Sequence, residues 1–139
     1  MVIGGCRSGK SAYALNYCNQ IPGSRKIFLA TSVPADEEMQ QRVTTHQEDR
    51  GPGWATIEEP LDIGGVLLKF SSQADVILVD CLTLWVSNLM ADGCEPEQIF
   101  QMAETVGKEL AALNSPVVFV SNEVGYRIVP DNKLARLFR

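Results

Sequence analysis

The chain has 139 residues, of which 45% are apolar and 21% charged, which excludes disordered and fibrous proteins and predicts one domain over residues 1–139. A net charge of −5 argues against nucleic-acid binding, which relies on a basic surface. No apolar run is long enough to span a membrane and no signal peptide or zinc-ligand spacing is recognisable, so we expect a cytoplasmic protein with reduced thiols.

Short apolar runs alternate with helix-like segments along the chain, which predicts an α/β fold with a mostly parallel sheet flanked by helices. We expect strands at residues 2–3, 26–30, 54–57, 76–79 and 117–120. We expect helices at residues 10–18, 35–50, 61–70, 82–90 and 95–113, and a last helix at 134–139 that ends in mid-course. Within 95–113, apolar side chains recur at helical spacing, which indicates a core-facing stripe.

A glycine-rich loop follows the first expected strand and opens the first helix. It fits the pattern G-x-x-x-x-G-K-[ST] and comprises Gly4, Gly5, Cys6, Arg7, Ser8, Gly9, Lys10 and Ser11. In such a loop, backbone amides surround phosphate groups, the lysine contacts the β- and γ-phosphates, and the hydroxyl completes a magnesium shell. We therefore predict a P-loop in which Lys10 is catalytic and Ser11 is a metal ligand for a bound nucleoside triphosphate.

Further polar residues follow the next strands of the predicted sheet. Asp80 ends an apolar run in the manner of a Walker B strand, whereas Glu58 and the segment Thr31, Ser32 and Val33 end two other strands. Ligands of open parallel sheets bind at the carboxyl ends of the strands, so we expect these residues to approach the P-loop. Asp80 is predicted to bind either the metal or a guanine base, and Glu58 is a suitable acceptor for guanine.

His46 is the only histidine, and it lies one helical turn from Arg42 and from Arg50. Two nearby cations favour phosphate oxygens and keep an imidazole neutral and therefore nucleophilic. Met39 and Val43 share this helix face, so a partly buried structural histidine is the alternative. Spacing alone favours that alternative.

Several segments occur together and in order along the whole chain: the P-loop, Ala30-Thr31-Ser32, the spacing from Arg42 to His46 and Arg50, WATIEEP over 54–60, residues 121–125 and residues 128–130. With this combination the chain resembles the bifunctional adenosylcobinamide kinase and adenosylcobinamide-phosphate guanylyltransferase family. The resemblance implies a RecA-like P-loop sheet, a homotrimer, the cofactors GTP, ATP and Mg²⁺, and the substrates adenosylcobinamide and its phosphate.

The resemblance also implies which residues act. His46 would carry GMP as a covalent intermediate, with Lys10 and Asp80 as further catalytic residues and Ser11 and Asp80 as metal ligands. The expected nucleotide-binding residues are the P-loop from Gly4 to Ser11, followed by Thr31, Ser32, Val33, Gln47, Arg50, Glu58 and Asp80.

Two other functions fit parts of the sequence. A P-loop small-molecule kinase would lack the nucleotidyl transfer that His46 implies, and a nucleotide-gated binding protein or inactive relative would have no use for Lys10, Ser11, His46 and Asp80 together. The chain is also expected to end about one helix and one or two strands short of the family's length, which predicts a sheet truncated at its C-terminus with an exposed edge.

Overall fold

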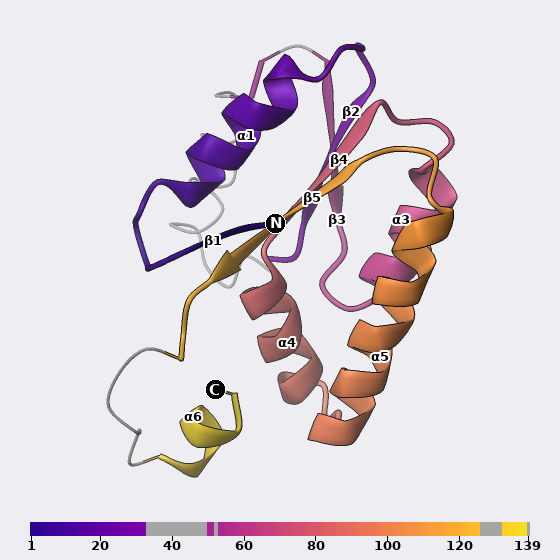
Figure 1. The fold of residues 1–139 in the computed structure, drawn as a ribbon. Coiled ribbons are helices and arrows are strands. Elements are labelled where there is room, and N and C mark those ends of the chain that lie inside the picture. Colours follow the sequence, from indigo (N-terminus) through magenta and orange to yellow (C-terminus); the bar gives the residue numbers. More distant parts are fainter. Residues whose placement is uncertain (33–49, 52, 126–131, 139) are drawn as a thin grey trace.

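The computed structural model describes residues 1–32, 50–51, 53–125 and 132–138. Five strands form one parallel sheet in the order β1-β5-β4-β2-β3 (Figure 1). The strands are β1 (Val2–Gly4), β2 (Lys26–Ala30), β3 (Trp54–Glu58), β4 (Val76–Asp80) and β5 (Val117–Asn122). The predicted α/β class and all five predicted strands are confirmed. Four of the strands extend one or two residues further toward the carboxyl edge of the sheet than predicted.

The helices lie close to their predicted positions. They are α1 (Lys10–Gln20), α3 (Ile63–Phe70), α4 (Leu82–Ala91), α5 (Pro96–Glu109) and α6 (Lys133–Phe138), with a 3₁₀ turn η1 (Leu110–Ala112) after α5. The helix predicted over 35–50 lies outside the described residues except at its last position. No helix in the described ranges is both long and apolar enough to cross a membrane.

Two predicted helix boundaries are wrong for identifiable reasons. The helix expected from residue 61 begins at Ile63, because the side chain of Asp62 accepts a hydrogen bond from Gly65 N at 2.9 Å and caps the helix there. The helix expected to reach residue 113 ends at Glu109, because the chain tightens into η1. Smaller shifts of one or two residues occur at α1, α4 and α6.

Helices cover both faces of the sheet, with α1 on one face and α3, α4 and α5 on the other (Figure 1). The α1-side core consists of Ala14, Cys18, Val76, Leu78, Cys81, Val118 and Val120. The α4-side core consists of Ile27, Leu29, Ile63, Leu67, Ala74, Ile77, Val79, Trp85, Leu89, Ile99 and Phe119. The predicted stripe of α5 is confirmed, since Ile99 is buried and Met102, Val106, Leu110 and Leu113 pack against the α4-side core.

Strand β4 lies at the centre of the sheet, between β5 and β2. Its first four residues, Val76, Ile77, Leu78 and Val79, are each 0% exposed. A strand covered on both faces needs apolar side chains on both, which explains its uninterrupted apolar run. Burial of each such side chain contributes roughly 1.5–3 kcal/mol relative to exposure. The strand therefore holds its last residue, Asp80, on a rigid support.

A buried lysine joins α1 to the sheet. Lys26, at the start of β2, is only 8% exposed, and its Nζ donates to the carbonyl oxygens of Cys18 at 2.9 Å and Asn19 at 3.0 Å. Carbonyl groups in the last turn of a helix have no partner within the helix, and the helix dipole favours a cation there. Lys26 therefore caps the carboxyl end of α1. The amino end of the same helix follows the P-loop.

Candidate functional site

The loop between β1 and α1 has the backbone of a phosphate-binding loop. Arg7 and Gly9 adopt left-handed conformations, with φ of 55° and 82°. The loop folds back on itself, because Ser8 N donates to Gly5 O at 3.3 Å and Lys10 Nζ donates to the same oxygen at 3.2 Å. A Cβ atom at Gly4 would lie 2.7 Å from Ser8 Oγ, so a larger residue here would require the Ser8 side chain to move.

The amino end of α1 is open to a ligand. Its N-cap residue, Gly9, provides no side-chain hydrogen bond, and no acidic residue occupies the first turn. Tyr13 N donates to Gly9 O at 2.9 Å, so the amide groups before it lie at the helix terminus. These amides and the positive end of the helix dipole favour an anion. Cys6, Arg7, Ser8 and Ser11 are exposed around this terminus.

Two carboxylates stand on the same face of the sheet as α1. Ala30, at the end of β2, pairs with Glu58 of β3 on one side and with Asp80 of β4 on the other. Residues at i and i+2 of a strand share a face, and Leu78 and Trp54 pack in the α1-side core, so Asp80 and Glu58 face the same way. Ala30 lies between them and is itself buried. The two carboxylates lie two strands apart, about 10 Å.

Arg50 contacts Thr56 and Phe28, which precede Glu58 and Ala30 by two positions on their strands. Its Nη1 donates to Thr56 Oγ1 at 2.7 Å, and its Cζ lies 3.4 Å from the centre of the Phe28 ring. Burial lowers the pKa of Arg50, and the negative charge of Asp80 acts in the opposite direction. A guanidinium stays charged even so, because its ordinary pKa is far above neutrality. The site therefore contains a fixed cation stacked on an aromatic ring beside Asp80.

Thr31 and Ser32 follow Ala30 at the same edge. Thr31 is fully buried, and its hydroxyl exchanges hydrogen bonds with the peptide groups of Cys81, whereas Ser32 is partly exposed. His46, Gln47 and Val33 lie outside the described residues. The structure thus brings the P-loop, Ser32, Arg50, Glu58 and Asp80 to one edge of the sheet, and the role of each remains a prediction.

The donor atoms at this edge suit Mg²⁺ that is shared between protein and nucleotide better than a metal ion bound by protein ligands alone. Within the described ranges, no group of three or more His, Cys, Asp or Glu residues could hold a metal ion. Mg²⁺ is usually bound by one or two protein oxygens, with nucleotide phosphates and water completing its shell. The Ser11 hydroxyl and the Asp80 carboxylate are oxygen donors of this kind.

Three polar residues near the edge were not predicted from the sequence. Asn88 Nδ2 donates to Thr31 O at 2.7 Å, and Asn122 Nδ2 donates to Thr83 Oγ1 at 2.9 Å. One signal for Asn88 was available, because asparagine is a poor helix former and it stands here in a mostly apolar helix. Nothing comparable singles out Thr83, whose partner comes from a distant strand.

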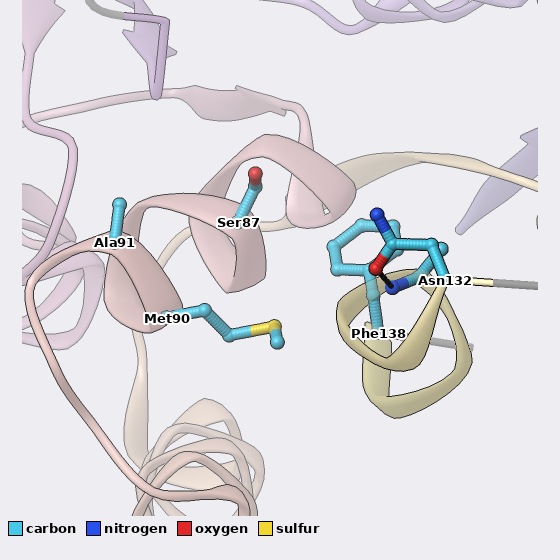
Figure 2. Close-up of a pocket in the computed structure, with 6 residues that line it drawn as sticks. Ser87, Met90, Ala91, Asn132 and Phe138 are labelled. Atoms are coloured by element: carbon cyan, nitrogen blue, oxygen red, sulfur yellow. Dashed lines mark hydrogen bonds between the residues drawn. The ribbon is translucent and has the colours of Figure 1, made fainter.

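Among the helices of the described residues, two cavities can be compared with this edge of the sheet. One of about 330 Å³ separates α4 from α6, and Figure 2 shows Met90 extending from α4 toward Phe138 of α6. Another, of about 500 Å³, lies between α3, α4 and α5 and includes Asp62, Trp85 and Glu109 in its lining. Neither lining includes a P-loop residue, so neither cavity is a candidate for the nucleotide phosphates.

The chain is similar to proteins of known family. The family model CobU, described as cobinamide kinase / cobinamide phosphate guanyltransferase, matches residues 1–139. The bifunctional adenosylcobalamin biosynthesis protein CobP of Pseudomonas aeruginosa is 34% identical over 139 residues, which cover 99% of this chain and 79% of that protein.

Two relatives carry the name bifunctional adenosylcobalamin biosynthesis protein CobU. The one from Salmonella typhimurium is 36% identical and the one from Escherichia coli 32% identical, each over 151 aligned residues that cover all of this chain and 82% of the relative. The P-loop and the amino end of α1, which has no side-chain cap, are consistent with the family match along the whole chain. This chain belongs to the cobinamide kinase and cobinamide phosphate guanyltransferase family.

Proposed function

We propose that residues 1–139 form one nucleotide-binding domain that catalyses two reactions at the carboxyl edge of its sheet. The first transfers the γ-phosphoryl group of ATP or GTP to the aminopropanol hydroxyl of adenosylcobinamide. The second transfers GMP from GTP to adenosylcobinamide phosphate and gives adenosylcobinamide-GDP. One observation carries the proposal. The P-loop leads into the amino end of α1, which has no side-chain cap, and α1 covers the face of the sheet on which Asp80 lies.

The phosphorylation step asks the protein chiefly to position its substrates and to neutralise charge. Lys10 is suited to the β- and γ-phosphates because it is anchored to the loop only through Gly5 O, and phosphate oxygens can replace that carbonyl. The amide groups at the start of α1 add donors whose position is fixed in advance.

Magnesium fits this proposal, with Ser11 and Asp80 as the protein residues that would hold it. When bound, the ion neutralises negative charge on the phosphates. Asp80 has a second possible role, as an acceptor for the guanine base together with Glu58. Both roles are consistent with its position beside Ala30.

The guanylyl transfer step needs a nucleophile from the protein, and we assign this role to His46. Its nitrogen attacks the α-phosphorus of GTP, the bond to the β-phosphate oxygen breaks and pyrophosphate leaves. A phosphate oxygen of the corrinoid then displaces the histidine. Arg50 supports this step as a buried cation beside Asp80, held by Thr56 and Phe28, which can stabilise charge on a nearby phosphate.

We further propose that the protein works as a homotrimer in the cytoplasm, where its nucleoside triphosphate substrates are present. Light scattering during size-exclusion chromatography measures the assembly directly. A mass of three chains, each of 15.2 kDa, is expected.

Labelled GTP tests the proposal. The protein is incubated separately with α-labelled and γ-labelled GTP and denatured, and the label that remains on the protein is measured. Retention of the α-label alone supports a nucleotidyl intermediate. A protein that phosphorylates adenosylcobinamide but retains no label is a kinase without nucleotidyl transfer, and one that does neither is a binding protein or an inactive relative.

A further inference from the structure

A threonine hydroxyl joins the end of β2 to the residue that follows Asp80. Thr31 is 0% exposed, and its Oγ1 donates to Cys81 O and accepts from Cys81 N, both at 2.8 Å. A hydroxyl has a single proton to donate, and here that proton is used by Cys81. The Thr31 hydroxyl is therefore occupied within the protein and does not face a ligand.

The main chain of Thr31 is held as firmly as its side chain. Its amide donates to Asp80 O at 3.2 Å, and its carbonyl accepts from Asn88 Nδ2 at 2.7 Å. The same amide group of Asn88 donates to Pro60 O at 3.2 Å, just beyond β3 and Glu58. These bonds tie together the ends of the strands that carry the two carboxylates.

The hydrogen bonds continue toward the P-loop. Cys81 Sγ lies 3.0 Å from Thr83 Oγ1, which accepts from Asn122 Nδ2 at 2.9 Å. Glu123 N, the next residue along the chain, donates to Gly4 O at 2.9 Å. A series of short polar contacts thus runs from the end of β3 across β2, β4 and β5 to the strand that begins the P-loop.

From these contacts we infer that Thr31 is a positioning residue for Asp80 and acts through Cys81. The inference rests on the proposed function, in which Asp80 contacts magnesium or guanine. Loss of the hydroxyl leaves the Cys81 N–H without its partner and removes one of two hydrogen bonds to Cys81 O, which still accepts from Trp85 N at 3.1 Å. The turn after Asp80 is then held less firmly. A displacement of about 1 Å at a binding group is enough to reduce affinity and rate.

The test compares Thr31→Val, which keeps the shape but removes the hydroxyl, with Thr31→Ser, which keeps the hydroxyl. Calorimetry gives the Kd for GTP in the presence of Mg²⁺, and steady-state assays give kcat/KM for both reactions below the melting temperature. We expect Thr31→Val to weaken GTP binding about tenfold and to lower kcat/KM about tenfold. A change of this size lies within the range of interaction energies between residues of one hydrogen-bond network. Thr31→Ser should stay within about twofold of the unchanged protein, since it keeps both hydrogen bonds.

Thr105→Val is the matched control, because this threonine on α5 donates only to Gln101 O within its own helix. If Thr31→Val does not fold, Thr31→Cys replaces it, since a thiol is a weaker donor of similar size. Normal binding and rates for Thr31→Val, or equal losses for the serine and valine variants, would overturn the inference.

A double-mutant cycle with Asp80→Asn separates the inference from the function on which it rests. We expect the effect of Thr31→Val on GTP binding to disappear in the Asp80→Asn background. If the losses of binding free energy caused by the two substitutions simply add, the positioning role of Thr31 is overturned, whereas the proposed role of Asp80 is not. An Asp80→Asn variant with normal GTP binding and rates overturns the proposed role of Asp80, and the inference with it.

Discussion

Lys10 and Asp80 reach the carboxyl edge of the sheet in different ways. Lys10 is the first residue of α1, and its Nζ donates to Gly5 O in the P-loop. Asp80 ends a strand whose preceding four residues are fully buried, and the residue after it is held by Thr31. A change at Lys10 therefore acts at the P-loop and the first turn of α1, whereas the position of Asp80 depends on the packing of the sheet.

Substitution of Lys10 by alanine should remove the kinase activity and leave the fold intact. The lysine contributes charge to the phosphates in the proposed reaction and belongs to neither core of the sheet. We expect kcat/KM for phosphorylation to fall by about 100-fold or more, the usual scale for loss of one group that stabilises transition-state charge. Lys108→Ala is the control, because this exposed lysine pairs only with Glu104 one turn away. A Lys10→Ala variant with an unchanged rate would remove the P-loop from the mechanism.

His46→Ala should lose guanylyl transfer and keep most of the phosphorylation activity, since in the proposed mechanism only the second reaction uses a nucleophile from the protein. In the unchanged protein the bond between histidine and GMP should be labile to acid and stable to alkali. The two activities are measured separately with adenosylcobinamide and with adenosylcobinamide phosphate. A structural histidine predicts a different result, in which both activities decline together with the melting temperature.

Cys18 should be unreactive in the folded protein. Burial raises its pKa to about 11, although Lys26 nearby acts to lower it. Below that pH the thiol stays protonated, and the thiolate is the form that reacts with alkylating agents. Iodoacetamide at about pH 8 should therefore modify the exposed Cys6 and reach Cys18 only after unfolding. Mass spectrometry of peptides from native and denatured samples measures both sites, and rapid native labelling of Cys18 would contradict the prediction.

The helices and strands show which parts of the fold local sequence can predict. The apolar run of β4 and the stripe of α5 were sufficient to place both elements, because burial on two faces and burial along one stripe require different residue patterns. The ends were less predictable. The start of α3 depends on a bond from Gly65 N to Asp62, and the end of α5 on the change to a 3₁₀ turn, and neither follows from apolar periodicity.

Asp62→Ala tests the cap of α3. The substitution removes the acceptor for Gly65 N at the amino end of a helix that contributes Ile63 and Leu67 to the α4-side core. Loss of such a cap typically costs about 1 kcal/mol. Urea denaturation should show that decrease in the free energy of unfolding, with an unchanged slope. Asp92→Ala, an exposed position after α4, should change stability by less than about 0.5 kcal/mol.

At the scale of the molecule, the placement of the P-loop, Asp80 and Glu58 at the carboxyl edge of the sheet could be predicted, but the strand order, which puts β1 and β3 on opposite sides of that sheet, could not. Parallel strands end at one edge of their sheet whatever their order, so the chemistry of that edge follows from the sequence. The insertion of β5 between β1 and β4 depends on pairings between residues far apart in the chain, such as Val2 with Val120. The partners of Thr31, Thr83 and Asn88 depend on the same long-range arrangement, so sequence could single out Asn88 as unusual but could not predict what any of the three contacts.

Nucleotide binding should stabilise the whole chain, since the proposed ligand joins α1 to the ends of the central strands and binds only the folded state. Mass action raises the free energy of unfolding by about 2.7 kcal/mol at a ligand concentration of 100 times Kd. The melting temperature should therefore rise by several degrees with Mg-GTP or Mg-ATP, and the rise should increase with the logarithm of ligand concentration. Lys10→Ala should show little of this rise while melting normally without ligand. If neither nucleotide shifts the melting curve, the chain has no working P-loop, and the reading as an inactive relative is preferred over the enzyme.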